Sequence, residues 1–248
     1  MGIDKENWAP ERSPSDAARS TLLQMIGGGR VAQAVYVAAR LNVADLLADG
    51  PKTVAELAKL SCTHAPSLNR LLRALASIGL FVEDADHSFR LTPIAGLLCS
   101  DASRSLRSMA LLHGDPYWWR SQGELLYCVQ TGKPAPPYLH GMDEWAYLAR
   151  HPETAAVFDE AMSANTLEQI PAILGAYDFS PINTLVDVGG GNGVLLAALL
   201  GAYPTMRGIL FDQAGVIEHA RPVLEVSGVA DRCERVSGGP VCRAADIG

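Results

Sequence analysis

The run from Asp187 to Gly193, Asp-Val-Gly-Gly-Gly-Asn-Gly, has the residue types and spacing best suited to holding a ligand. Glycines let the backbone approach a ligand closely and adopt positive φ angles. A second acid, Asp212, follows the next apolar segment. A carboxylate at that place can accept hydrogen bonds from both hydroxyls of a ribose. The pattern therefore predicts a site for a ligand that carries a ribose.

A strand–helix–strand unit is expected to position these residues. Residues 183–188 are predicted to form a buried strand, 194–202 a helix and 207–211 a second strand that ends at Asp212. This order begins a parallel α/β sheet, and 232–237 is a candidate third strand. NAD is the less favoured ligand, because Val194 stands where the dinucleotide fingerprint requires its last glycine.

The N-terminal half reads as a winged helix. Residues 17–47 have helical periodicity, and the triplet Gly27-Gly28-Gly29 is expected to divide them into two helices. Thr53-Val-Ala-Glu56 matches a capping box that opens a short helix through Leu60. Residues 67–78 carry one apolar stripe and end before Gly79. Segments 80–83 and 88–91 then form a predicted hairpin.

DNA binding is one possible function of such a unit, since winged helices can insert their third helix into DNA. Only Arg70 and Arg73 would face phosphates there, and the surroundings are not basic. The apolar helices at 17–47 instead favour an interaction module that buries this surface against a second subunit.

Residues 101–180 are predicted to be mostly helical and are rich in aromatic side chains. The pattern is typical of core packing, and equally of a wall around an aromatic ligand. The aromatic residues are Tyr117, Trp118, Trp119, Tyr127, Tyr138, Trp145, Tyr147 and Phe158.

Composition excludes several classes of protein. The chain has 248 residues, 48% of them hydrophobic, and a formal charge of −7, which argues against disorder and against a nucleic-acid partner. The five scattered cysteines show no ligand spacing, so we expect reduced thiols and no metal. No apolar run reaches the roughly 20 residues of a membrane span, and the N-terminus lacks a signal peptide. We therefore expect a cytoplasmic protein without a membrane partner.

The loop, its preceding acid and Asp212 together resemble the class I S-adenosylmethionine (SAM) methyltransferases. Further segments resemble the plant-type and actinobacterial small-molecule O-methyltransferases, in matching order across residues 17–238. They are Thr63–Ala76 and Phe89–Pro93 in the winged helix, then Trp118-Trp119, Trp145–Ala149, His151–Glu153, Phe158–Met162 and Asn165.

The resemblance implies an α/β fold and a division of the chain into four parts. Residues 1–16 would be a flexible tail, 17–100 a winged-helix dimerisation domain, 101–180 a helical region with the substrate pocket, and 181–248 part of a Rossmann-like SAM-binding domain. The protein would be a homodimer that moves the sulfonium methyl of SAM to a hydroxyl, usually phenolic, of a small aromatic metabolite.

The resemblance also assigns residues to the site. Trp119, Met162 and Asn165 would line the acceptor pocket. The cofactor would be held by Asp187, Gly189, Gly190, Gly191, Gly193 and Asp212, and the acid that precedes the glycines suits the cationic amino-acid end of SAM.

After Ser237 the sequence departs from the family. No aspartate stands at position 239, and the His-Asp-Trp segment that carries the family's general base is not found. No catalytic residue is therefore assigned; His113 is the least unsuitable of the remaining histidines, and His219 is not a substitute. We expect a truncated or out-of-frame end after Gly238, an unpaired apolar edge on the first strand, and turnover near background.

Two alternatives concern the same family. One is a relative that keeps SAM as a structural ligand and hydroxylates its substrate. The other is a non-catalytic protein that pairs with a full-length relative through the N-terminal domain. The mass of the product would separate methylation from hydroxylation.

Overall fold

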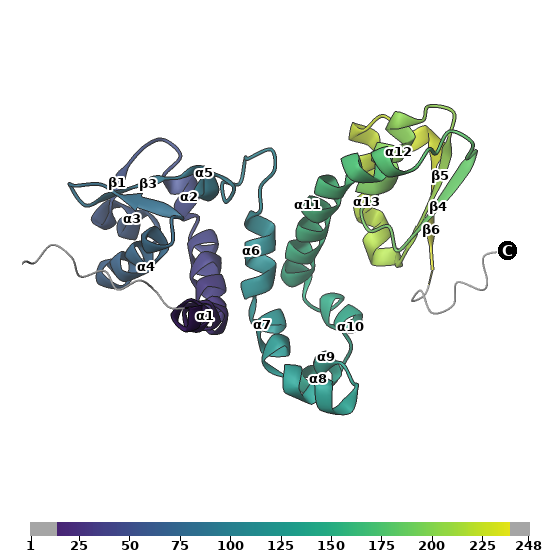
Figure 1. Ribbon diagram of the computed structural model, residues 1–248. Coiled ribbons are helices and arrows are strands. Elements are labelled where there is room, and N and C mark those ends of the chain that lie inside the picture. The colour runs from purple at the N-terminus through teal and green to yellow at the C-terminus, as the bar shows by residue number, and fades with distance from the viewer. Residues whose placement is uncertain (1–13, 239–248) are drawn as a thin grey trace, which may run out of the picture. The chain divides into compact units, whose positions relative to one another are not determined.

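The computed structural model describes residues 14–238, and the chain divides into two compact units, Met1–Thr92 and Pro93–Gly248 (Figure 1). The first is mainly helical with a small antiparallel sheet, and the second combines helices with a parallel sheet. The predicted α/β class is confirmed. Most of the predicted tail lies outside the described residues, but Pro14, Ser15 and Asp16 already belong to the first helix.

The first unit begins with one long helix where two were predicted. Helix α1 runs without interruption from Pro14 to Arg40, through Gly27, Gly28 and Gly29. The prediction of a break was wrong, because glycine costs a helix about 1 kcal/mol relative to alanine but readily adopts helical dihedral angles. The other helices of this unit are α2 (Val43–Leu46), α3 (Val54–Leu60) and α4 (Ala65–Ser77).

The capping box and the hairpin are both confirmed. Thr53 Oγ1 accepts a hydrogen bond from the Glu56 N–H at the start of α3, and the Glu56 carboxylate accepts one from the Thr53 N–H. Strands β2 (Phe81–Glu83) and β3 (Ser88–Leu91) pair antiparallel, and the unpredicted β1 (Lys52–Thr53) adds to β3. The buried rings of Phe81 and Phe89 join this sheet to the core of the winged helix.

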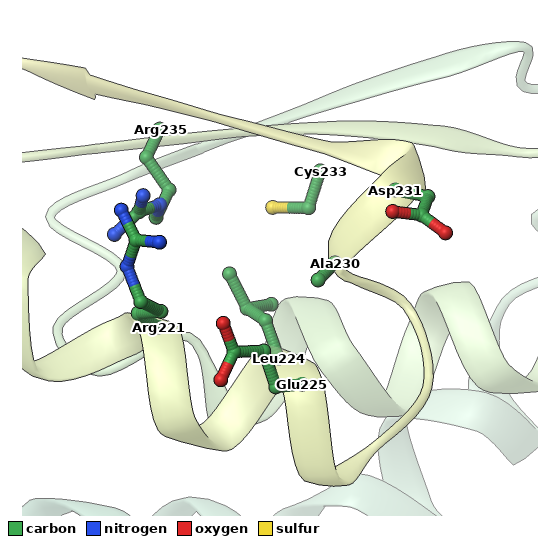
Figure 2. Close-up of a pocket in the computed structure, with 7 residues that line it drawn as sticks. All are labelled: Arg221, Leu224, Glu225, Ala230, Asp231, Cys233 and Arg235. Carbon is green, nitrogen blue, oxygen red and sulfur yellow. The ribbon is translucent and has the colours of Figure 1, made fainter.

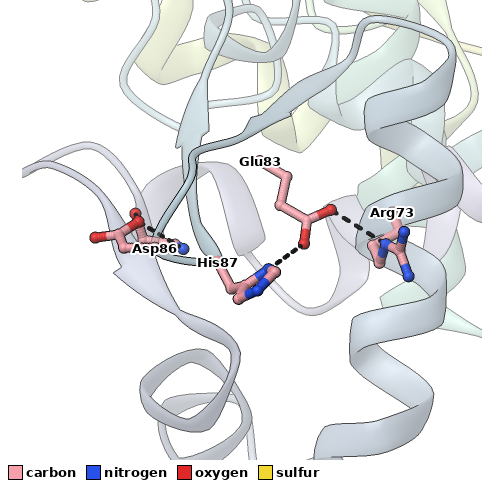
Figure 3. A network of polar contacts seen from close by, with 5 residues as sticks. Arg73, Glu83, Asp86 and His87 are labelled. Carbon is pink, nitrogen blue, oxygen red and sulfur yellow. Dashed lines mark hydrogen bonds and ion pairs between the residues drawn. The ribbon is translucent and has the colours of Figure 1, made fainter.

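A network of ion pairs ties the hairpin to α4 (Figure 3). Glu83 accepts from Arg73 Nε at 3.1 Å, and one of its oxygens lies 3.0 Å from His87 Nδ1. At the tip of the hairpin, Asp86 accepts from the hydroxyl of Ser88 at 2.7 Å. The charge of Arg73 is therefore balanced within the unit.

The second unit starts with a series of helices that ends in a long one. They are α5 (Pro93–Gly96), α6 (Arg107–Gly114), α7 (Pro116–Gly123), α8 (Leu125–Thr131), α9 (Ala135–His140), α10 (Glu144–Leu148) and α11 (Pro152–Ala176). Rings stack between them: Tyr117 lies 4.0 Å from Tyr147 and 4.9 Å from His140, centroid to centroid. Burial raises the pKa of Tyr117 to about 12. Several of the predicted aromatic residues thus pack against one another.

A three-stranded parallel sheet follows α11. Its order is β4 (Thr184–Val188), β5 (Arg207–Asp212), β6 (Cys233–Ser237), and all three are predicted strands. Helices α12 (Val194–Ala202) and α13 (Ala214–Val226) pack on the face that carries Leu210, and the short 3-10 helix η1 (Ala230–Arg232) leads into β6 (Figure 1). Because the strands are parallel, the ends of β4 and β5 place the glycine loop beside Asp212.

Strand β4 lies at an edge of this sheet. Within residues 14–238 it pairs with β5 alone, and Val186 and Val188 are each 42% exposed. The unpaired apolar edge that the sequence predicted is thus present in the described part of the chain.

The helices within residues 14–238 include none with the length and apolar character of a membrane span. No disulfide joins the described cysteines, Cys62, Cys99, Cys128 and Cys233, to one another.

Candidate cofactor site

The glycine loop connects the end of β4 to the start of α12. Gly189, Gly191 and Gly193 have positive φ angles of 74°, 60° and 81°, a region that other residues rarely adopt. The Gly189 N–H donates to the carbonyl of Phe211 at 2.8 Å, which fastens the loop to the end of β5. The loop is therefore held in a conformation that depends on its glycines.

Gly190 leaves no room for a side chain. A Cβ placed there would collide with the carboxylate of Asp187 and with the side chain of Leu210. The side chains of Asp187 and Leu210 thus require a glycine at this position, and the close approach of the backbone to a ligand stays a prediction.

Asp212 closes the loop from the end of β5. Its Oδ2 accepts from the Gly191 N–H at 2.8 Å, and its Oδ1 accepts from the Gln213 N–H at 2.7 Å. Each carboxylate oxygen has a second lone pair, so Asp212 can accept further hydrogen bonds from the hydroxyls of a ribose. The loop and the predicted ribose acid are therefore one hydrogen-bonded unit.

Asp187 lies beneath the loop with an unsatisfied oxygen. Its Oδ2 is buried and has no hydrogen-bond partner among the described residues. Burial raises the pKa of Asp187, and the nearby charge of Asp212 raises it further. A buried carboxylate without a partner is costly, and a cationic ligand group beside it would remove that cost.

Helix α11 approaches the same loop, a contact that the sequence did not predict. Asn192 Nδ2 donates to Ser163 Oγ at 2.7 Å, so the loop's one residue with a polar side chain reaches across to α11. One turn earlier, Asp159 Oδ2 lies 3.5 Å from Nδ1 of His219 on α13. Burial raises the pKa of Asp159, the charge of His219 opposes this, and the charge of Asp212 adds to it.

The predicted acceptor-pocket residues lie on two helices. Met162 and Asn165 are on α11, next to Ser163, and Trp119 is on α7. The ring of Trp118, beside Trp119, stacks on Phe158 of α11 with centroids 6.0 Å apart. The structure thus joins α7 and α11 near these residues, and their contact with an acceptor stays a prediction.

The histidines do not supply an evident general base. His113 lies on α6, and no contact joins it to the glycine loop among the described residues. His219 is far from the glycine loop in sequence, but its pairing with Asp159 of α11 brings it near the site. The loop, Asp212 and α11 thus form a candidate ligand site, and no proton acceptor is assigned to it.

A separate hollow of about 260 Å³ lies between α13 and β6 (Figure 2). Arg221 and Arg235 lie at one side of it and Asp231 at the other, with the thiol of Cys233 between them. Burial raises the pKa of Cys233. None of the residues that line this hollow belongs to the glycine loop.

Comparisons with known proteins agree with this architecture. Residues 23–101 match the O-methyltransferase dimerisation domain, and residues 123–242 match the O-methyltransferase domain. The chain therefore belongs to the O-methyltransferase family whose members combine these two domains.

Relatives and solved structures give the extent of the similarity. The phenazine O-methyltransferase PhzM of Lysobacter antibioticus is 46% identical over 88% of this chain, which spans 64% of that relative's length. The mitomycin biosynthesis 6-O-methyltransferase of Streptomyces lavendulae is 34% identical over 96% of the chain and 68% of its own length. The crystal structure of LaPhzM has a TM-score of 0.84 at 45% identity, over 90% of this chain and 67% of that one.

Proposed function

We propose that the chain binds SAM at the glycine loop and, as an O-methyltransferase, transfers its methyl group to a hydroxyl of a small aromatic metabolite. The observation that carries the proposal is the pairing of Asp212 with Gly191 next to Gly190, whose Cβ position lies against the unsatisfied oxygen of Asp187. This arrangement offers one acid to a ribose and a second acid to a cation, and SAM has both groups.

The residues of the site fit SAM. Asp212 would hold the ribose hydroxyls, and Asp187 would face the cationic amino-acid end. The glycines Gly189, Gly190, Gly191 and Gly193 would lie against the cofactor with their backbone. When bound, SAM supplies an activated methyl group that passes to an oxygen nucleophile.

The acceptor pocket is proposed for the side of the loop where α11 lies. Met162, Asn165 and Trp119 would contact an aromatic ring and orient its hydroxyl towards the methyl group, because correct orientation supplies much of the rate of such a transfer. The names of two further Streptomyces relatives give aromatic acceptors of this kind, a dihydroxynaphthoate and an aminohydroxybenzoate.

Calorimetry and a transfer assay with the 248-residue chain test this proposal. SAM should bind with a stoichiometry of one per chain, and NAD should give no heat of binding. Isotope-labelled methyl should then appear, at the low rate expected without an assigned general base, on one of a panel of hydroxylated naphthoates, benzoates and phenazines, with a mass gain of one methylene. Binding of NAD in place of SAM would refute the proposed cofactor, and SAM binding without transfer to any acceptor would refute the proposed reaction.

We also propose that the chain forms a homodimer through the N-terminal domain. Apolar side chains at the N-terminal part of α1 are 58% to 72% exposed, namely Leu22, Leu23, Met25 and Ile26. A surface of this kind is typical of an interface. Light scattering should give twice the chain mass of 26.4 kDa, and Ile26→Glu should give the monomer. A monomeric wild type would refute the proposal. A cytoplasmic location stays a prediction.

A further inference from the structure

The hydroxyl of Ser163 links helix α11 to the glycine loop. It donates to the carbonyl of Asp159 in its own helix at 2.6 Å and accepts from Asn192 Nδ2 at 2.7 Å. Because its hydrogen is used within the helix, the hydroxyl presents a lone pair to the loop in a fixed direction. Ser163 is partly buried, which shields this contact from water.

A second contact from the same face of α11 supports the link. Asp159 lies one turn before Ser163 and pairs with His219 of α13. Residues four apart on a helix share a face, so this face of α11 is attached both to the loop before α12 and to the helix after β5. The body of α11 also packs against α12.

The other side chains of this turn belong to the proposed acceptor pocket. Met162 immediately precedes Ser163, and Asn165 follows two residues later. Phe158, next to Asp159, contacts the rings of Trp118 and Trp145 with centroids 6.0 Å and 5.9 Å away. A shift of α11 at Ser163 would therefore move Met162, Asn165 and the aromatic cluster around Phe158.

We propose that Ser163 and Asn192 are positioning residues, which place the acceptor-pocket helix according to the state of the cofactor loop. The inference rests on the proposed binding of SAM to that loop. Asn192 lies between Gly191, whose N–H is bound to Asp212, and Gly193, where α12 begins. A ligand that contacts Asp212 and the glycines fixes the backbone on both sides of Asn192, and the Asn192 side chain transmits this order to α11.

Hydrogen exchange measured by mass spectrometry tests the inference on the full chain with and without SAM. In the wild type, SAM should slow amide exchange in the loop (189–194) and in α11 around residues 159–167. The expected slowing in α11 is about two- to tenfold, the effect of one hydrogen bond. Ser163→Ala should keep the slowing in the loop and lose it in α11. By reciprocity, SAM affinity should fall by no more than the same factor.

Two further variants make the result specific. Ser163→Thr keeps a hydroxyl at this position and should restore the slowing in α11. Thr166→Ala removes a hydroxyl from the same helix with no contact to Asn192, and should behave as the wild type. Far-ultraviolet circular dichroism of each variant establishes that α11 is folded before exchange is compared.

The outcomes separate this inference from the proposed function. Slowing of α11 that persists in Ser163→Ala, or that is absent from the wild type while the loop is protected, would overturn the inference and leave SAM binding intact. If the wild type showed no heat of binding and no protection of the loop, the proposed function would be overturned, and this inference with it.

Discussion

The pKa values of several acids are shifted in opposite directions in the winged-helix unit and in the candidate cofactor site. In the winged-helix unit, hydrogen bonds lower the pKa of three acids: the side chain of Thr53 lowers that of Glu56, His87 that of Glu83 and Ser88 that of Asp86. In the second, burial raises the pKa of Asp159 and of Asp187.

The difference shows which acids serve the fold and which are available to a ligand. An acid whose charged form is hydrogen-bonded stabilises the folded chain at neutral pH. A buried acid without a partner destabilises it, and such groups concentrate at functional sites. These three acids of the winged helix therefore have partners within their own unit, whereas Asp187, next to the glycine loop, has a buried oxygen without one, which we assign to the cation of the proposed cofactor.

The largest effect on SAM affinity is expected from removing Asp212, which both holds the loop and is proposed to bind the ribose. Asp212→Ala would remove two hydrogen bonds of the loop and the proposed ribose contacts. Since a hydrogen bond to a charged group contributes about 1.5–3 kcal/mol, SAM affinity should fall about 10- to 100-fold or more, as measured by calorimetry. Asp231→Ala, which removes an exposed acid of η1, is the control and should bind SAM as the wild type does.

An intermediate effect is expected at Asp187, where one substitution should stabilise the ligand-free fold and weaken SAM binding. Because its pKa is raised, the charged form destabilises the fold above that pKa, and this cost disappears as the pH falls below the ordinary carboxyl value. Asp187→Asn should raise the melting temperature of the ligand-free chain at neutral pH by about 2–4 °C and weaken SAM binding. The gain should shrink at acidic pH.

A matched exchange sharpens the contrast. The pKa of Asp178 is lowered by hydrogen bonds from the backbone and side chain of Ser180, so Asp178→Asn should not raise the melting temperature. An equal gain in both variants would show that charge removal alone, rather than the burial of Asp187, is responsible.

The smallest effect is expected in the winged helix. Glu83→Gln removes the ion pairs with Arg73 and His87, which are exposed and therefore contribute little. The melting temperature should fall by no more than about 2 °C at neutral pH. Because the pKa of Glu83 is lowered, this contribution is lost as the pH falls through the lowered value, so variant and wild type should converge there. A change in SAM affinity would contradict the separation of the two regions.

The elements that were predictable from sequence are those whose partners lie nearby in the chain. Thr53 and Glu56 cap a helix across one turn, and the segments of the hairpin are joined by a short polar tip. Helix α12 has the predicted bounds, because the glycine-rich turn ends at Gly193 and an apolar segment begins directly after it. At Gly27–Gly29, local propensity was an insufficient guide, since a modest cost per glycine does not interrupt a helix that is favoured on both sides.

The contacts within the site that were not predicted join residues far apart in sequence. Asn192 and Ser163, and likewise Asp159 and His219, meet only because α11 packs beside the loop. The one available signal was that Asn192 is the only residue with a polar side chain between the glycines. The unsatisfied oxygen of Asp187 is also a consequence of packing, because Asp187 and Leu210 both lie against Gly190.

Proton release on cofactor binding tests most directly whether Asp187, beside the glycine loop, pairs with the cationic group of SAM. SAM would be titrated calorimetrically into the wild type at a series of acidic to neutral pH values, each in two buffers with different ionisation enthalpies. An amino group titrates near pH 8 and stays charged at acidic pH. A cation beside Asp187 lowers its raised pKa, so binding should release protons, and Asp187→Asn should release fewer. Binding heats that do not depend on the buffer, or proton uptake, would contradict the account.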